Sequence, residues 1–252
     1  MREESQNTTG IVISRLAKHE ADAQVRVFTR DLGKVDLRVR GFFRPGSKLA
    51  GHLEPFNLCE LLLLRGRNHD YIASAVNLDS FGRLKADLNK LYFAGRALAL
   101  FDCLIKPEQE DQDLFELLLA FLSALDQSPV ELTKDRGQLY FDFFLFKLLE
   151  VLGSAPDLSH CLIKQETIGT EEAYLDLEQG GLVCPACASK QAGDTLIKLK
   201  ASTLELFRRA VSASFFQVET IVSPATALKQ FSRTLKAFLE YHYPISDLSR
   251  RF

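Results

Sequence analysis

The chain has 252 residues, enough for one large or two to three small domains, and its 46% hydrophobic and 25% charged residues exclude a disordered protein. No apolar run approaches the roughly 18 residues of a membrane span, and the first residues lack a signal peptide's apolar stretch. Five cysteines without an export signal indicate reduced thiols in the cytoplasm. The net charge of −2 hides a segregation: residues 1–80 sum to +2, residues 81–188 to −9 and residues 189–252 to +5, which suggests a polyelectrolyte partner unless the segments pack on one another.

Residues 1–80 are predicted to form a β-domain. Apolar alternation or β-branched runs predict five strands, at residues 10–14, 25–29, 34–40, 58–64 and 71–76. Asp31-Leu32-Gly33 predicts a hairpin turn between the second and third strands. Five short strands in about 70 residues favour a small closed barrel of the OB type, with an SH3-like barrel or an open sheet as alternatives.

From residue 82 the apolar period becomes helical. Helices are predicted over residues 84–105, 114–125 and 138–152, and the third is apolar almost all round, so we expect it at the centre of a helical domain of residues 81–252. Residues 157–190 break this pattern and are expected to form a cysteine-containing insert, with one short strand at 174–178. The fold class expected is therefore α+β.

The first candidate site is a basic stretch at residues 26–48. If Val25, Val27 and Leu37 point into the barrel, the intervening side chains point outward as a cationic face with aromatic residues. Such a face is typical of single-strand binding grooves, where cations follow the phosphates and aromatic rings stack on bases. The alternative is a solvated strand face, with Phe28 buried under the helical part. The candidate residues are Arg26, Arg30, Lys34, Arg38, Arg40, Arg44, Lys48, Phe28, Phe42 and Phe43.

The second candidate site is a group of cysteines. Cys184-Pro185-Ala186-Cys187 has the spacing of a zinc knuckle, and Cys161 is a further thiol 23 residues upstream. A structural zinc needs four ligands, so the fourth ligand is missing unless His160 supplies it. A redox dithiol is the alternative, although no thioredoxin-like βαβ pattern surrounds the motif. Zinc therefore stays an open expectation.

The last predicted helix carries an apolar stripe flanked by Lys229 and Arg233. This stripe either packs in the core or binds an amphipathic peptide with acidic residues. The sequence contains no phosphate loop, no dinucleotide-binding glycine motif and no nucleophile elbow, and its histidines have no metal-binding spacing. The chain is therefore expected not to be an enzyme.

Four segments together resemble the RecO family of bacterial recombination mediators. Residues 20–34 (EADAQVRVFTRDLGK) and 41–56 (GFFRPGSKLAGHLEPF) are similar to the family's N-terminal signature. Residues 148–161 (LLEVLGSAPDLSHC) are similar to the helix that leads into its cysteine region, and residues 180–187 (GGLVCPAC) to the end of that region. The likeness spans nearly the whole chain in the same order.

The resemblance implies an N-terminal OB-fold that binds DNA, a helical domain and, in many members, a zinc-ribbon-like insert. It implies binding to single- and double-stranded DNA, annealing of complementary strands, and loading of a recombinase onto protein-coated single-stranded DNA. The implied partners are RecR, RecF and the acidic-apolar C-terminal tail of the single-strand DNA-binding protein, in a cytoplasmic, nucleoid-associated setting.

One motif departs from the family. Zinc-binding members carry two C-x-x-C pairs, whereas the first pair reads Cys161-Leu162-Ile163-Lys164 in this chain. The zinc is therefore not carried over from the resemblance. A different class of function, a protein-interaction scaffold with only incidental DNA contact, is the alternative to a DNA-binding mediator.

Overall fold

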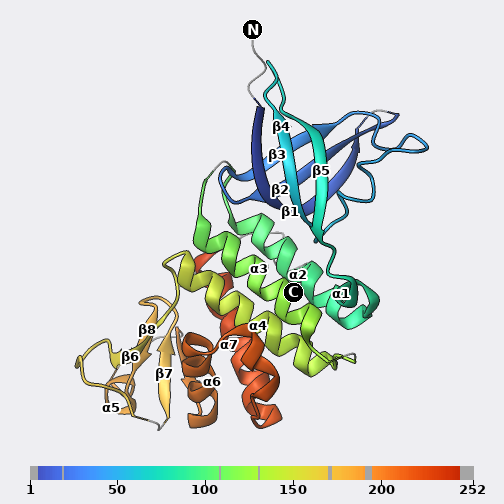
Figure 1. The fold of residues 1–252 in the computed structure, drawn as a ribbon. Helices are drawn as coiled ribbons and strands as arrows, with labels where there is room; N and C mark the ends of the chain where they lie inside the picture. The colour runs from blue at the N-terminus through green and yellow to red at the C-terminus, as the bar shows by residue number, and fades with distance from the viewer. Residues whose placement is uncertain are drawn as a thin grey trace. The chain divides into compact units, whose positions relative to one another are not determined.

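The computed structural model describes residues 5–18, 20–107, 109–129, 131–169, 172–190 and 195–244. The chain forms two compact units, Met1–Gln127 and Ser128–Phe252, and each is described by itself (Figure 1). The first unit contains the β-barrel and three helices. The boundary expected at residues 80 and 81 separates the barrel from these helices, and it stays a prediction about which parts fold on their own.

The barrel has five strands: β1 (Ser5–Lys18), β2 (Asp22–Thr29), β3 (Gly33–Val39), β4 (Leu58–Leu64) and β5 (Tyr71–Asp79). They close in the order β1-β2-β3-β5-β4, with β4 antiparallel to β1 and β3 parallel to β5. This confirms the predicted five-stranded OB-type barrel. The first strand is longer than predicted because β1 pairs with both β2 and β4 along its length.

Alternation along the strands fills the barrel. Val25, Val27 and Leu37 point inward and are fully or almost fully buried, together with Leu61 of β4. Phe42, in the loop after β3, belongs to the same core and is 2% exposed. The barrel is thus packed with side chains, so only its outer face, its loops and its ends remain for binding.

Three helices complete the first unit: α1 (Gly82–Ala86), α2 (Leu88–Leu104) and α3 (Gln112–Gln127). Asp87 caps α2, because its side chain accepts hydrogen bonds from the N–H groups of Asn89 and Lys90. The β2–β3 turn lies against the chain that follows α2: Gly33 has φ +64°, and a Cβ there would lie 2.0 Å from the carbonyl oxygen of Gln109. The turn therefore needs glycine both for its backbone conformation and for this close approach.

The second unit is built around α4 (Lys134–Val151), which is buried on most sides, as predicted. Helix α4 packs against α6 (Ala201–Ser212), the 3₁₀ helix η1 (Phe215–Thr220) and α7 (Ala225–His242). None of the helices that the structure describes combines the length and apolar character needed to cross a membrane.

The insert of the second unit is a small sheet in the order β6-β8-β7-β9 (Figure 1). Its strands are β6 (Asp157–Cys161), β7 (Ala173–Asp176), β8 (Gly181–Val183) and β9 (Leu196–Leu199), with the short helix α5 (Pro185–Ala188) after β8. The sequence predicts only β7; β6 is no shorter, but three of its five residues are polar, and β8 has only three residues, so neither shows an apolar alternation. The sheet also continues past the predicted insert, since β9 lies beyond residue 190.

Candidate nucleic-acid interface

The pairing of β2 with β3 sets the outer face of the barrel. Phe28 lies opposite Lys34, Arg26 opposite Asp36, and Gln24 opposite Arg38. Cross-strand partners in an antiparallel pair point to the same face, and the intervening valines fill the core. The side chains of Arg26, Lys34 and Arg38 therefore lie on the outer face of the barrel, as predicted. The segments that cover this outer face differ between the two ends of the strands.

Near the β2–β3 turn, helices cover the outer face. Phe28 is fully buried, with its ring centroid 4.8 Å from that of Phe101 on α2 and 6.5 Å from that of Phe115 on α3. Of the two positions that the sequence leaves open for Phe28, the structure shows the buried one, because the apolar sides of α2 and α3 pack on this part of the sheet. Its ring is not available to stack on a base.

The cations beside Phe28 are paired with carboxylates. Arg26 lies 2.8 Å from Asp36 and 2.9 Å from Asp102 of α2, and these hydrogen bonds raise the pKa of Arg26 and lower that of Asp36. Lys34, whose side chain is only 8% exposed, lies 3.2 Å from the same Asp102 carboxylate. The third cation of this region, Arg30, lies 2.9 Å from Glu116 of α3. We call this region the neutralised end of the barrel, and its cations are Arg26, Arg30 and Lys34.

The opposite end of the barrel carries cations that have no such partners. The C-terminal end of β3, the β1–β2 turn and the β4–β5 loop meet here, since Arg38 of β3 pairs with Tyr71 at the start of β5. In the part of the chain that the structure describes, none of the cations at this end forms an ion pair. We call this region the open end; its cations are Arg38, Arg40, Arg44, Lys48, Arg65 and Arg67.

A groove of 350 Å³ runs between the open-end loops and β5. Its lining includes Arg40, Arg65 and Tyr71, and the Arg40 guanidinium lies 4.6 Å from the centre of the Tyr71 ring. Two acids of this end accept backbone N–H groups: Asp22 accepts that of Gly41 at 2.8 Å, and Asp70 accepts that of Gly66 at 3.2 Å. The pKa of Arg40 is raised mainly by its hydrogen bond to Tyr71 and to a smaller extent by the charge of Asp22. The groove therefore combines positive charge with an aromatic ring.

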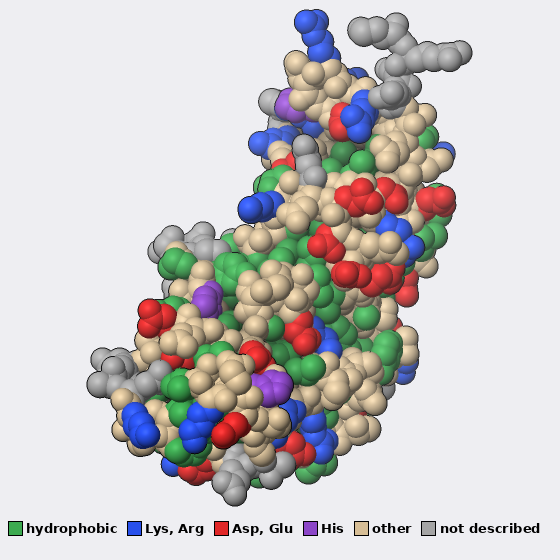
Figure 2. Space-filling view, turned by 90° about the vertical axis from the view of Figure 1, so that its left-hand side faces the viewer, with side chains coloured by type: hydrophobic (Ala, Val, Ile, Leu, Met, Phe, Trp, Pro, Cys, Tyr) green, Lys and Arg blue, Asp and Glu red, His purple; other side chains and the backbone are tan. Residues whose placement is uncertain are grey.

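The two phenylalanines of the loop after β3 have different roles. Phe42 is 2% exposed and closes the barrel core, so it is not free to stack, whereas Phe43 is 49% exposed. The N–H of Phe43 donates to the carbonyl of Ala21 at 2.9 Å, which ties the loop to the β1–β2 turn. On the face drawn in Figure 2, Lys and Arg side chains lie toward the top, with a group of Asp and Glu side chains below them, and further Lys and Arg side chains lie at the bottom of the view.

Sequence reasoning missed the basic residues of the β4–β5 loop. Arg65 and Arg67 belong to a segment that local patterns identify only as a turn. Tyr71, the first residue of β5, is identified by the same patterns only as part of a strand. Two arginines in this turn could have identified the region from the sequence, because the β4–β5 loop of an OB-type barrel lies beside the face of strands 2 and 3.

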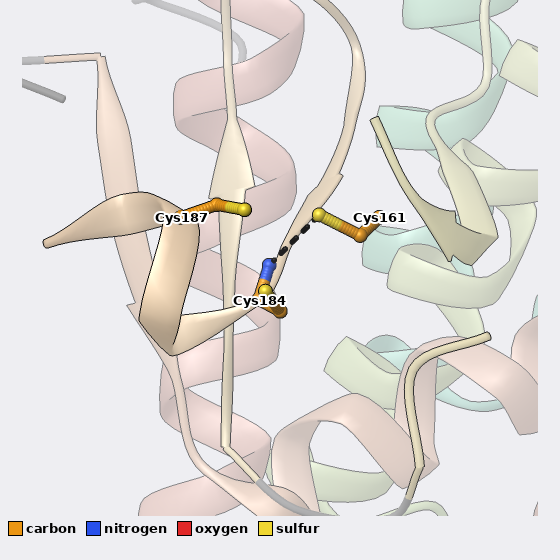
Figure 3. Close-up of side chains that lie close together, drawn as sticks. All are labelled: Cys161, Cys184 and Cys187. Atoms are coloured by element: carbon orange, nitrogen blue, oxygen red, sulfur yellow. Dashed lines mark hydrogen bonds between the residues drawn. The ribbon is translucent and has the colours of Figure 1, made fainter. Parts of the chain in front are cut away.

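The three cysteines of the insert converge. Their sulfur atoms lie within 4.8 Å of one another, and the side chains of Cys161 and Cys187 point toward each other from β6 and α5 (Figure 3). The N–H of Cys184 donates to the Cys161 sulfur at 3.4 Å. The expected fourth ligand, His160, is not in this group; its Nδ1 lies 2.7 Å from the hydroxyl of Ser159.

The cysteine environments differ in how they favour a thiolate. Burial opposes ionisation of Cys161, but hydrogen bonds from the backbone N–H groups of Cys184, Lys164 and Ile163 outweigh it and lower its pKa to about 7. Burial and the two neighbouring thiols raise the pKa of Cys187 to about 11. The Cys161 thiol therefore ionises more readily than an ordinary cysteine, as is expected of a thiol that binds a metal ion. The three residues fit three of the four positions of a structural zinc.

A second groove lies between α4 and α7 in the helical unit. It measures 280 Å³, and its lining brings Lys229 and Arg233 together with Leu139 and Leu228. Lys229 and Arg233 are exposed and form no ion pair within the described residues. Two acids also line the groove. Asp135 is exposed, whereas Asp142 is buried and accepts hydrogen bonds from Gln138 at 2.7 Å and Ser232 at 3.1 Å.

Comparison with known proteins covers both parts of the chain. Residues 1–81 match the family model described as "Recombination protein O N terminal", and residues 85–251 match "Recombination protein O C terminal". The chain is 31% identical over 243 residues to the protein named "DNA repair protein RecO" of Roseiflexus sp. (strain RS-1), covering 96% of this chain and 82% of that protein. It is 29% identical over 246 residues to the protein of the same name from Anaeromyxobacter dehalogenans (strain 2CP-C), covering 97% and 94%.

Proposed function

The chain belongs to the RecO family of DNA repair proteins, and from this premise we propose that it is a mediator without enzymatic activity that binds single- and double-stranded DNA at the open end of its barrel. In this role it anneals complementary strands and, with RecR and RecF as partners, helps to load a recombinase onto protein-coated single-stranded DNA. The observation that carries the proposal is the set of cations at the open end, which have no carboxylate partners among the described residues.

The open end has the two components that single-strand binding needs. Its cations, of which all but the half-buried Arg38 are exposed, can displace counterions from phosphates, which is the main source of affinity for a polyanion. Phe43 and Tyr71 offer rings on which bases of any sequence can stack. The same cations reduce the repulsion between two strands that are brought together for annealing. The three cations of the neutralised end are left out of this site, since Asp36, Asp102 and Glu116 already balance them.

The test is a salt titration of DNA binding with the full chain. The double variant Arg38→Ala/Arg40→Ala should reduce the slope of log K against log salt by about 0.7 for each single-strand phosphate that the protein no longer neutralises. Arg30→Ala is the matched control, because Arg30 is also an exposed arginine of the barrel but is paired with Glu116. A double variant with wild-type affinity at every salt concentration would overturn the site and favour the scaffold alternative.

A second candidate function is binding of the acidic-apolar tail of the single-strand DNA-binding protein in the groove between α4 and α7. Lys229 and Arg233 supply positive charge at its rim, and Leu139 and Leu228 supply an apolar wall. A short peptide with acidic residues and an apolar C-terminal end matches both features. The hydrogen bonds that Asp142 accepts from Gln138 and Ser232 reduce its repulsion of such a peptide.

Arg233→Ala should weaken binding of such a peptide by about 1.5 to 3 kcal/mol, the contribution of a hydrogen bond to a charged group. Fluorescence titration measures the loss. Lys236→Ala is the matched control on the same helix, since Lys236 lies 3.8 Å from Glu240 and does not line the groove. Equal affinity of the Arg233→Ala variant and the wild type would remove this groove as the peptide site.

A further inference from the structure

The cysteine cluster of the insert differs from the four-cysteine zinc site that the family resemblance implies. The turn that begins at Cys161 is formed in the structure, because the N–H of Gln165 donates to the carbonyl of Cys161 at 2.8 Å. The second turn, Cys184 to Cys187, closes in the same way, with the N–H of Cys187 donating to the carbonyl of Cys184 at 3.0 Å. Both turns are therefore formed, and Lys164 stands where the first turn would supply its second thiol.

No fourth donor replaces the missing thiol among the described residues. Cys161, Cys184 and Cys187 form a group that no histidine or carboxylate of the described part of the chain joins. A lysine ammonium has three hydrogen-bond donors and no lone pair, so Lys164 cannot take the fourth position while it is protonated. Structural zinc sites are almost always four-coordinate and closed, and the residues that the structure describes supply three of the four ligands. The residues thus do not fit the four-thiolate zinc site.

We propose that the cluster of Cys161, Cys184 and Cys187 is a three-thiolate site for a soft monovalent ion, Cu(I), and that Lys164 is the residue that prevents a closed zinc site. Thiolates are the ligands that soft ions such as Cu(I) select, and Cu(I) does not need a fourth ligand. Three sulfur atoms bound at about 2.3 Å around one ion are about 4 Å apart, which agrees with sulfur atoms that already lie within 4.8 Å of one another. On binding, each thiol releases its proton to solvent, and no bond to carbon changes.

Burial supports the same occupant. Cys161 is 1% exposed and Cys187 is 6% exposed, whereas Cys184 is half-buried. An ion that enters past Cys184 is shielded from water by the other two residues, which favours an ion that binds sulfur without a water ligand. The inference concerns the insert alone and does not depend on the proposed DNA site in the barrel.

The experiment is a metal titration of the reduced full chain under anaerobic conditions. Cu(I) is supplied in competition with a Cu(I) chelator, Zn(II) is supplied in competition with a zinc chelator, and thiolate-to-metal absorption is recorded. The wild type should bind one Cu(I), and Cys161→Ser should lose it. Lys164→Cys should bind Zn(II) at least about a hundredfold more tightly than the wild type, because the binding free energy of a structural zinc is shared among four ligands.

Lys198→Cys is the matched control for the added thiol. Lys198 lies on β9 of the same sheet, 2.6 Å from Glu172, and that carboxylate is not part of the cysteine group. This variant should keep the wild-type affinity for Zn(II). Wild-type zinc binding as tight as that of Lys164→Cys would overturn the proposal, and so would a wild type that takes up no Cu(I). If Lys164→Cys does not fold, the Cu(I) stoichiometries of the wild type and of Cys161→Ser decide alone.

Discussion

The two ends of the barrel have a similar residue content but different surroundings. Residues 26–34 and 38–48 both contain several cations among apolar residues, and both contain phenylalanine. At the neutralised end, α2 and α3 cover the aromatic ring and supply carboxylates to the cations. At the open end, the cations have no carboxylate partner among the described residues, and Phe43 is exposed. A count of basic residues therefore does not locate a polyanion site, because the field of each cation depends on the acids that fold against it.

The physical roles of the two ends follow from solvation. Lys34 is almost fully removed from water, so its charge is tolerable only while Asp102 compensates it. Exposed cations such as Arg40 and Arg65 keep their hydration and can exchange water for phosphate at little cost. The neutralised end is thus expected to hold the barrel on α2 and α3, and the open end to bind. Four predictions test this division.

The largest effect is expected for Phe28→Ala. Removing a ring that is fully buried between Phe101 and Phe115 should lower the free energy of unfolding by about 3 to 5 kcal/mol. Denaturant unfolding measures the loss. Phe43→Ala is the matched control and should change stability by less than about 0.5 kcal/mol, since its ring is half exposed. Equal stability losses in the two variants would contradict the division.

Asp102→Ala should have the next largest effect. It removes the carboxylate shared by Arg26 and Lys34 and leaves the buried ammonium without compensation. We expect a loss of about 2 to 3 kcal/mol in the free energy of unfolding, below the usual range for a buried pair because the Asp102 side chain is 20% exposed. Lys34→Met removes the buried charge and keeps most of the volume, so it should cost less than about 1 kcal/mol. DNA affinity of either folded variant should stay at the wild-type value.

Phe43→Ala should weaken single-strand binding by about 1 to 3 kcal/mol, the usual contribution of one aromatic–base stack. Equilibrium titration with a fluorescent oligonucleotide at one fixed salt concentration measures it. Phe216→Ala is the control, because Phe216 is 52% exposed but belongs to η1 of the other unit. An unchanged affinity of Phe43→Ala would leave the open end as a purely electrostatic site.

The smallest effect concerns pH. Arg26 lowers the pKa of Asp36 in the folded state, so the unfolded chain binds this proton more readily. The resulting stabilisation is present above the ordinary aspartate pKa of about 4 and is lost as the pH falls through the lowered folded value. Asp36→Asn should remove this acid dependence and cost less than about 1 kcal/mol near neutral pH, since the pair is half exposed. Unfolding curves at several pH values would contradict this if the variant kept the wild-type dependence.

Much of the fold follows from local patterns. The alternation of Val35, Leu37 and Val39 identifies β3, and the apolar surface all around residues 138–152 identifies the buried helix α4. These assignments succeed because strand and helix periods are properties of neighbouring residues. The substitution of Lys164 for a cysteine is likewise visible in the sequence, as is the absence of nucleotide-binding motifs.

The sequence by itself thus determined the barrel strands and the long helices, the order of the barrel and helical parts, and most of the candidate cations and thiols. The tertiary structure alone decided which of them are available. Asp102 and Glu116 reach Arg26 and Arg30 from 76 and 86 residues away, and Cys161 meets Cys184 across 23 residues. Burial and ion pairing depend on residues that are distant in the chain, and no local period records which of those residues will fold against a given side chain.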